Sequence, residues 1–102
     1  MPQFLVLAYD GTGDEAISRR KAVRPAHIAG IGPMLGRGEL KAAGAILDDA
    51  GDMIGSVVIA EFPSRAELDA WLAREPYVTE GVWKTIEVRP FHIAVLDNKI
   101  VS

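Results

Sequence analysis

The sequence predicts an α+β fold in which four strands and two helices follow one another in the order β-α-β-β-α-β. Two observations carry this prediction. Short apolar, β-prone runs alternate with two longer stretches of helical spacing, and the two middle runs are separated only by a short segment that contains a five-residue turn. This order is the ferredoxin-like plan, in which a four-stranded antiparallel sheet carries both helices on one face. We expect the spatial strand order 4-1-3-2.

The composition is that of a single packed domain spanning residues 1–102. Apolar residues make up 49% of the chain and charged residues 25%, as in ordinary globular domains. The absence of cysteine excludes disulfides, thiolate catalysis and thiolate metal sites. A net charge of −3 argues against nucleic acid as a partner, because phosphate binding requires a basic surface. Without a long apolar run or a secretion leader, we expect no membrane contact and a cytoplasmic location.

The first predicted strand covers residues 3–9, whose apolar side chains we expect to be buried on both faces of the sheet. The stretch 10–13 reads Asp-Gly-Thr-Gly and ends this strand. Either Asp14 or Ser18 can then cap the helix that follows.

The loop after the first strand begins a match to the G-x-G-x-x-A dinucleotide pattern, over residues 11–16. Asp14 and Glu15 argue against a nucleotide, because both would repel a pyrophosphate at the start of the helix. The chain is also too short for a doubly wound sheet. We therefore interpret the match as a turn whose glycines permit positive φ angles.

The first predicted helix has apolar residues at helical spacing but contains Pro25 and Pro33. Each interior proline removes a backbone hydrogen bond and clashes with the preceding turn, at a cost of about 3 kcal/mol. We therefore expect a kinked helix, or two helical pieces in line, ending near residues 36–38.

The second and third predicted strands form a hairpin. They cover residues 39–47 and 55–62 and are joined by a turn at 48–52. The third strand is rich in β-branched residues and should be largely buried. The second helix starts after Ser64, which forms a capping box with Glu67 three residues later.

The second helix should end before Pro76, which disfavours helical backbone at the residue preceding it and starts another short turn. Its expected buried residues are Ala66, Leu68, Trp71 and Leu72. The last predicted strand covers residues 85–96 and contains Pro90. Proline cannot donate to a central ladder, so Pro90 indicates an edge strand or a bulge.

A homodimer is the expected assembly. A domain of this size buries only about 60–65% of its unfolded surface, which makes it marginal alone. Both faces of the strands around Phe4, Val6, Val57 and Ile59 are apolar, whereas the two helices can cover only one of them. A second copy packed sheet to sheet would cover the other face.

His27 is the strongest candidate for chemistry. It lies four residues after Val23, four before Ile31 and seven before Met34, in the core-facing column of the first helix. It is either a satisfied core residue or, with a carboxylate to orient one ring nitrogen, a group suited to proton transfer. The other histidine, His92, is interpreted as structural. Two such distant histidines and no cysteine predict no metal site.

The carboxylate that could orient His27 is Glu75, which is equally well placed to be a helix cap. Tyr77 adds a hydroxyl that can bind a ligand or satisfy itself at the rim of a site. Four basic residues occur close together on the first helix: Arg19, Arg20, Lys21 and Arg24. Most of them we assign to a solvated helix face. Arg24 differs, because it lies beside the apolar stripe, three residues before His27, where a guanidinium can hold an anionic group.

These residues resemble the YciI-like (YCII-related) family, beginning with the Arg-x-x-His stretch that ends at His27. The matching stretches are collinear over nearly the whole chain: residues 21–28, 43–44, 55–62, 70–71, 75–78, 81–82 and 88–91. The resemblance implies a ferredoxin-like fold assembled into a dimeric α+β barrel. It also implies an active site made by the helix histidine and the acid of an Asp-Pro-Tyr motif.

In this chain the resemblance assigns the catalytic roles to His27 and Glu75, with Arg24, Ser56 and Tyr77 as substrate-binding neighbours. Glu75 departs from the family pattern, which has aspartate. The extra methylene moves the carboxylate by more than ~1 Å, and a displacement of that size can reduce a rate about 10²-fold. Pro25 within the helix is a second departure.

The sequence leaves two functions open. The first is a cofactor-independent lyase or isomerase that moves protons on a small cyclic or aromatic-derived anion. Relatives in the resembled group include a dehydrochlorinase of hydroxylated chloroaromatics, and muconolactone isomerase shares the barrel. The second is a non-catalytic module that binds a small molecule in the same pocket.

Overall fold

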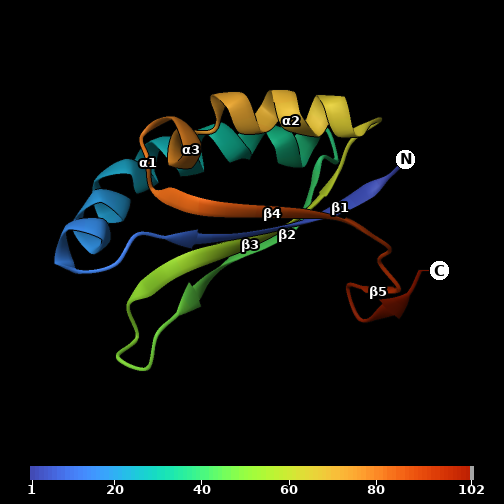
Figure 1. Cartoon of the computed structure of the whole chain (residues 1–102). Coiled ribbons are helices and arrows are strands. Elements are labelled where there is room, and N and C mark those ends of the chain that lie inside the picture. The colour runs from blue at the N-terminus through green and yellow to red at the C-terminus, as the bar shows by residue number, and fades with distance from the viewer. Residues whose placement is uncertain (102) are drawn as a thin grey trace.

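The computed structural model describes residues 1–101 as one antiparallel sheet covered by helices, followed by a small hairpin. The strands of the sheet are β1 (Gln3–Asp10), β2 (Leu40–Leu47), β3 (Met53–Glu61) and β4 (Trp83–Phe91). The helices are α1 (Asp14–Gly36), α2 (Arg65–Arg74) and the single turn α3 (Pro76–Thr79). All three lie on one face of the sheet (Figure 1). The strand order β2-β3-β1-β4 confirms the predicted topology.

The core lies between the sheet and the helices. In the central strand β1, Phe4, Val6 and Ala8 are buried, whereas Leu5 and Leu7 between them stay partly exposed. Because successive strand residues point to opposite faces, the second set lies on the face without helices. The prediction that residues 3–9 are buried on both faces is therefore wrong for the single chain.

Helix α1 starts differently from the sequence prediction. Gly13 is the residue at its N-cap, with φ 89° and ψ 177°, and no side chain caps the first turn. Neither Asp14 nor Ser18 takes that role. A glycine serves here because the chain leaves β1 through a positive φ that residues with a side chain rarely adopt.

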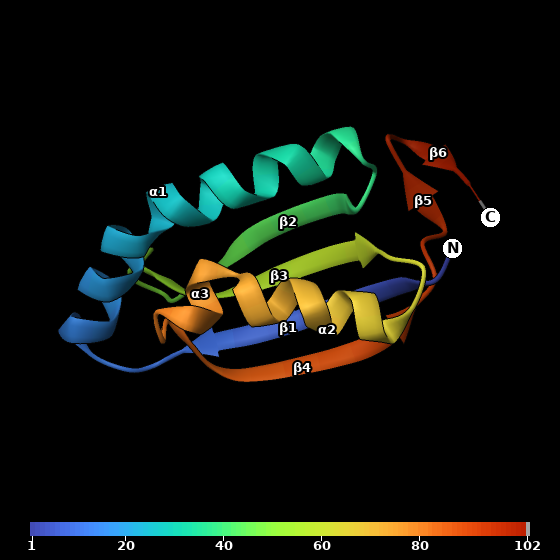
Figure 2. The same cartoon turned by 90° about the horizontal axis from the view of Figure 1, so that it is seen from above.

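Both prolines of α1 are accommodated in one continuous helix, so the alternative of two separate pieces is wrong. Its axis changes direction along its length (Figure 2). Pro25 and Pro33 are both exposed, so water can hydrate the carbonyl groups that they leave unpaired. The helix ends at Gly36, as predicted.

The second helix begins as predicted, because the Ser64 side chain accepts a hydrogen bond of 3.3 Å from the Glu67 backbone N–H. Leu68 and Trp71 are buried beneath it, but Ala66 is exposed, contrary to the prediction. Ala66 lies in the first turn, on the side of α2 that faces away from the sheet. As predicted, Pro76 starts a new helical turn, α3.

The end of the chain departs most from the prediction. The last strand of the sheet stops at Phe91 and does not continue to residue 96. The chain instead forms a hairpin of β5 (Val95–Leu96) and β6 (Lys99–Ile100), seen apart from the sheet in Figure 2. Asp97 and Asn98 form its turn, both with positive φ, as two-residue hairpin turns require. Pro90 lies in β4, an edge strand, as predicted.

Across residues 1–101, none of the helices combines the length and the apolar character needed to cross a membrane.

Candidate functional site

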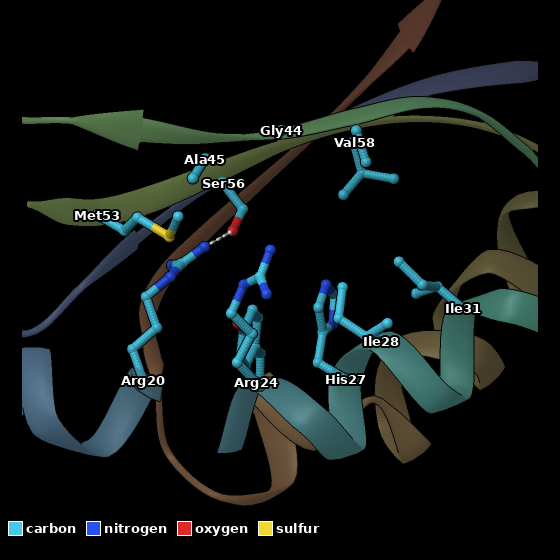
Figure 3. Close-up of a pocket in the computed structure, with 12 residues that line it drawn as sticks. Arg20, Arg24, His27, Ile28, Ile31, Gly44, Ala45, Met53, Ser56 and Val58 are labelled. Carbon is cyan, nitrogen blue, oxygen red and sulfur yellow. Dashed lines mark hydrogen bonds between the residues drawn. The ribbon is translucent and has the colours of Figure 1, made fainter. Parts of the chain in front are cut away.

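A pocket of about 170 Å³ opens between α1 and the inner surfaces of β2 and β3. Arg20, Arg24 and His27 point into it from α1, and Ser56 points toward them from β3 (Figure 3). Tyr77, from α3, completes the polar part of the lining. The helix provides these groups because positions 20, 24 and 27 are spaced by four and three residues and so share one face.

His27 and Glu75 are brought together at the wall of this pocket. The Nδ1 atom of His27 and a carboxylate oxygen of Glu75 form a hydrogen bond, and both residues are buried. The same oxygen accepts the backbone N–H of Tyr77 at 3.2 Å. Glu75 ends α2 and caps α3, so two helices fix its position. An ionised Glu75 requires the proton on Nδ1, which leaves Nε2 as the basic nitrogen of the ring.

Aromatic contacts hold the imidazole in place. The rings of His27 and Tyr77 stack with centroids 4.0 Å apart, and Trp83 meets His27 edge-on at 6.3 Å. Burial raises the pKa of the Tyr77 hydroxyl, while the positive charges of Arg20 and Arg24 oppose that rise. Tyr77 is therefore neutral at physiological pH.

Arg20 is the site residue that the sequence prediction missed, because we assigned it to the solvated helix face. It is only 4% exposed, and its Nη1 atom contacts both carboxylate oxygens of Asp10 at 3.0 Å. Its Nη2 atom donates to Ser56 at 2.8 Å. One signal was available: Arg20 lies seven residues before His27, in the same core-facing column. Asp10, the last residue of β1, was missed as well.

The other basic residues of α1 behave differently. Arg19 forms an exposed ion pair of 2.7 Å with Glu15, which fits the predicted solvated face. Arg24 is exposed at the pocket mouth, where a bound anion can reach its guanidinium. Burial of Arg20 has a cost in free energy, because its Nε atom has no hydrogen-bond partner within residues 1–101. An unpaired buried donor costs about 1–3 kcal/mol, which the charge-assisted bonds of the same guanidinium to Asp10 and its bond to Ser56 offset.

Metal binding finds no support in this part of the chain. Among residues 1–101, no three histidine, aspartate or glutamate side chains cluster closely enough to hold a metal ion. His92 lies outside the pocket, in the segment that follows β4.

A model of the YCII-related domain matches residues 2–92 of the chain. The chain belongs to this family. It is 34% identical over 93 residues to Protein YciI of Escherichia coli O6:H1, which covers 85% of this chain and 95% of the relative. It is 33% identical over 81 residues to an uncharacterised protein of Haemophilus influenzae, covering 74% of this chain and 83% of that protein. The match confirms the family expected from the sequence.

Solved structures share the fold. The 5-chloro-2-hydroxyhydroquinone dehydrochlorinase (TftG) of Burkholderia phenoliruptrix, in complex with 2,5-dihydroxybenzoquinone, superposes with a TM-score of 0.78. It is 24% identical to this chain, and the match covers 88% of this chain and 93% of that one. An antibiotic biosynthesis monooxygenase superposes at 0.53 with 22% identity, covering 91% and 98% of the two chains. These likenesses confirm the α+β, ferredoxin-like fold class of the chain.

Proposed function

We propose that this YCII-related protein is a cofactor-independent enzyme that moves protons on a small cyclic or aromatic-derived anion, as a lyase or an isomerase. One observation carries the proposal: the buried His27–Glu75 pair lies at the wall of a pocket that also contains two arginines. A histidine that served only to fill the core would need a hydrogen-bond partner, but it would not need a pocket lined by arginines beside it.

His27 is the proposed general base. Its Nε2 atom takes a proton from the substrate, and the resulting imidazolium is stabilised by the carboxylate of Glu75 bound to Nδ1. Such positioned proton transfer contributes about 10²–10⁴-fold to a rate. The same imidazolium can return the proton to another carbon in an isomerisation, or hold it while a leaving group departs.

The pocket favours a compact anion. Its volume of about 170 Å³ suits a single substituted ring. Arg20 and Arg24 make the interior positive, and a guanidinium binds a carboxylate or phenolate with two parallel hydrogen bonds. The dehydrochlorinase of similar fold was crystallised with 2,5-dihydroxybenzoquinone, a molecule of this size and type.

We also propose that the protein is a cytoplasmic homodimer, in which two copies pack through the faces without helices. Leu5 and Leu7 of β1 and Val57 and Ile59 of β3 lie on that face and stay partly exposed in the single chain. A strip of four large aliphatic residues on adjacent strands favours a sheet-to-sheet contact.

The proposal is tested by incubating the purified protein in D₂O with a panel of small cyclic ketones and hydroxylated chloroaromatics. Proton NMR detects deuterium incorporation, and an ion-selective electrode detects chloride release. We expect His27→Gln and Glu75→Gln to lose at least 10²-fold of any activity. His92→Gln is the matched control and should retain it.

The binding-module alternative gives a different pattern. If the wild type binds these compounds with an affinity that His27→Gln leaves unchanged, and no compound is exchanged or converted, the protein is a binding module.

A further inference from the structure

Ser56 sits between two groups that can only donate hydrogen bonds. The Arg20 guanidinium donates to its Oγ atom at 2.8 Å, and the Trp83 indole N–H donates to the same atom at 3.1 Å. Neither an arginine side chain nor an indole nitrogen can accept a hydrogen bond. The direction of both bonds is therefore fixed by chemistry.

A serine hydroxyl has two acceptor lone pairs and one hydrogen. In Ser56 both lone pairs are taken by these two donors. Among the hydrogen bonds within residues 1–101, the Ser56 hydroxyl appears as an acceptor only. Its hydrogen must therefore point away from Arg20 and Trp83. Ser56 is 4% exposed and lines the pocket, so the open direction is the pocket interior.

We propose that the Ser56 hydroxyl donates a hydrogen bond to the carbonyl oxygen of the substrate and to the enolate oxygen that forms from it. The inference rests on the proton-transfer function proposed above and narrows its substrate class. The substrate must present an acceptor oxygen to Ser56 while the adjacent carbon–hydrogen bond faces His27. A ligand that offers a hydrogen-bond donor at this position leaves two donors facing each other.

Nε2 of His27 removes the proton from the carbon next to the carbonyl group, and the carbon–hydrogen electron pair forms a carbon–carbon double bond. The carbonyl π electrons move onto the oxygen, which Ser56 binds and Arg24 faces across the pocket (Figure 3). The enolate then collapses in one of two ways. If a further carbon–carbon double bond is conjugated with it, the resulting dienolate takes the proton back from His27 at its far carbon and the carbonyl group re-forms. Alternatively, it expels a leaving group, with its electron pair, from the carbon next to the deprotonated one, so that the carbonyl group re-forms and a double bond joins those two carbons.

Asp10, Arg20 and Trp83 are positioning residues in this arrangement. Asp10 fixes the guanidinium through both carboxylate oxygens at 3.0 Å, and Arg20 together with Trp83 fixes the hydroxyl. A donor held in place before the charge develops needs no reorganisation during the reaction, and loss of one such donor costs about 10²–10³ in kcat.

The test compares two probes that differ at one oxygen: 4-nitrophenolate, in mildly alkaline buffer, carries a charged oxygen, and 4-nitroanisole carries a neutral methoxy group in its place. Calorimetric titration gives the ratio of their affinities for the wild type, which should favour the phenolate. Ser56→Ala should lower that ratio about tenfold or more, because a hydrogen bond to a charged oxygen is lost. Ser56→Thr keeps the hydroxyl and should keep most of the ratio.

Trp83→Phe supplies a second, independent variant. It retains the Ser56 hydroxyl but frees one of its lone pairs, so the hydroxyl can turn and the ratio should fall partway. If circular dichroism shows that Ser56→Ala does not fold, the affinity ratio of Trp83→Phe decides the test. Ser18→Ala, at an exposed serine of α1, is the matched control and should leave the ratio unchanged.

The outcomes separate this inference from the proposed function. Suppose that Ser56→Ala and Trp83→Phe weaken the binding of both probes equally, or of neither, while the wild type still exchanges protons. Ser56 is then structural, and this inference fails while the proposed function stands. If the wild type binds neither probe and exchanges no protons, the proposed function fails with it.

Discussion

At the scale of single residues, the imidazole of His27 is held from three directions. Glu75 binds Nδ1, Tyr77 stacks on the ring at 4.0 Å, and Trp83 meets it edge-on. These contacts fix both the plane of the ring and its tautomer, so the remaining nitrogen has a defined direction. Precise placement of this kind contributes to catalysis because a misplacement of about 1 Å can cost 10²-fold in rate.

Substitution of His27 separates catalysis from core filling. His27→Gln can still donate to Glu75, so we expect nearly native stability with activity reduced by about 10²–10⁴-fold. His27→Phe removes the partner of a buried carboxylate and should destabilise the protein by about 3–5 kcal/mol. Urea denaturation provides the measurement. A His27→Phe protein more stable than the wild type would show that His27 is a core filler.

Tyr77 predicts how stability responds to alkaline pH. Its pKa is raised by burial in the folded state, so the folded protein holds the phenolic proton more tightly than the unfolded chain. The stabilisation that results is fully present below about pH 10, the pKa of tyrosine in the unfolded chain. It is lost as the pH rises through the higher pKa of Tyr77 in the folded protein. Tyr77→Phe should therefore flatten the alkaline fall in the free energy of unfolding. Tyr9→Phe, at a residue 45% exposed, is the control and should leave that fall unchanged.

The sequence predicted which residues come together in the pocket where the signal was local. The spacing of His27 along the helix placed it on the core-facing column, and the family pattern supplied its partner Glu75. Arg20 was missed because basic residues on a helix are usually solvated, and its partner Asp10 is brought to it only by the folded chain. A pairing between a strand end and a helix leaves no periodic trace in the sequence.

At the scale of elements, local signals again decided what could be predicted. The cap at Ser64 and the helix stop before Pro76 were found because each acts through its immediate neighbours. The last strand was extended too far because the apolar residues after Phe91 read as one run. The turn at Asp97 and Asn98, which adopt positive φ, was not recognised as a hairpin.

Helix α1 contains a glycine that lowers its stability, which leads to a prediction at the scale of elements. Gly30 lies within the helix, and an added Cβ would meet no atom within 4 Å. Gly30→Ala should therefore stabilise the protein by about 0.5–1 kcal/mol. Gly55→Ala is the contrasting case, because its Cβ would lie 2.5 Å from the backbone oxygen of Ala8. Overpacking of this kind typically costs about 1–3 kcal/mol, and thermal unfolding should move the two variants in opposite directions.

At the scale of the whole molecule, helices cover one face of the sheet and leave the other open, where an apolar strip of β1 and β3 lies beside polar residues of β4. The topology followed from the order of the elements alone, since few arrangements of β-α-β-β-α-β bury both helices. In the proposed dimer a second copy covers the other face, so the burial predicted for residues 3–9 does not appear in a single chain.

A charge on the open face tests the proposed dimer. Leu7→Glu places a carboxylate among Leu5, Val57 and Ile59, and burial of unpaired charges at a twofold contact is strongly unfavourable. Multi-angle light scattering should then report half the mass of the wild type. Leu35→Glu makes the same change at an exposed leucine of α1 and should not alter the mass. A wild type that is monomeric at all accessible concentrations would contradict the proposal.

The protonation state of His27 is the most direct test of the central claim, which is that Glu75 orients a basic nitrogen toward the pocket. A long-range ¹H–¹⁵N correlation spectrum at neutral pH distinguishes the two ring nitrogens. We predict that Nδ1 carries the proton shared with Glu75 and that the Nε2 resonance shifts when 4-nitrophenolate is added. A ring whose Nδ1 carries no proton, and whose Nε2 resonance does not respond to the ligand, would contradict the account.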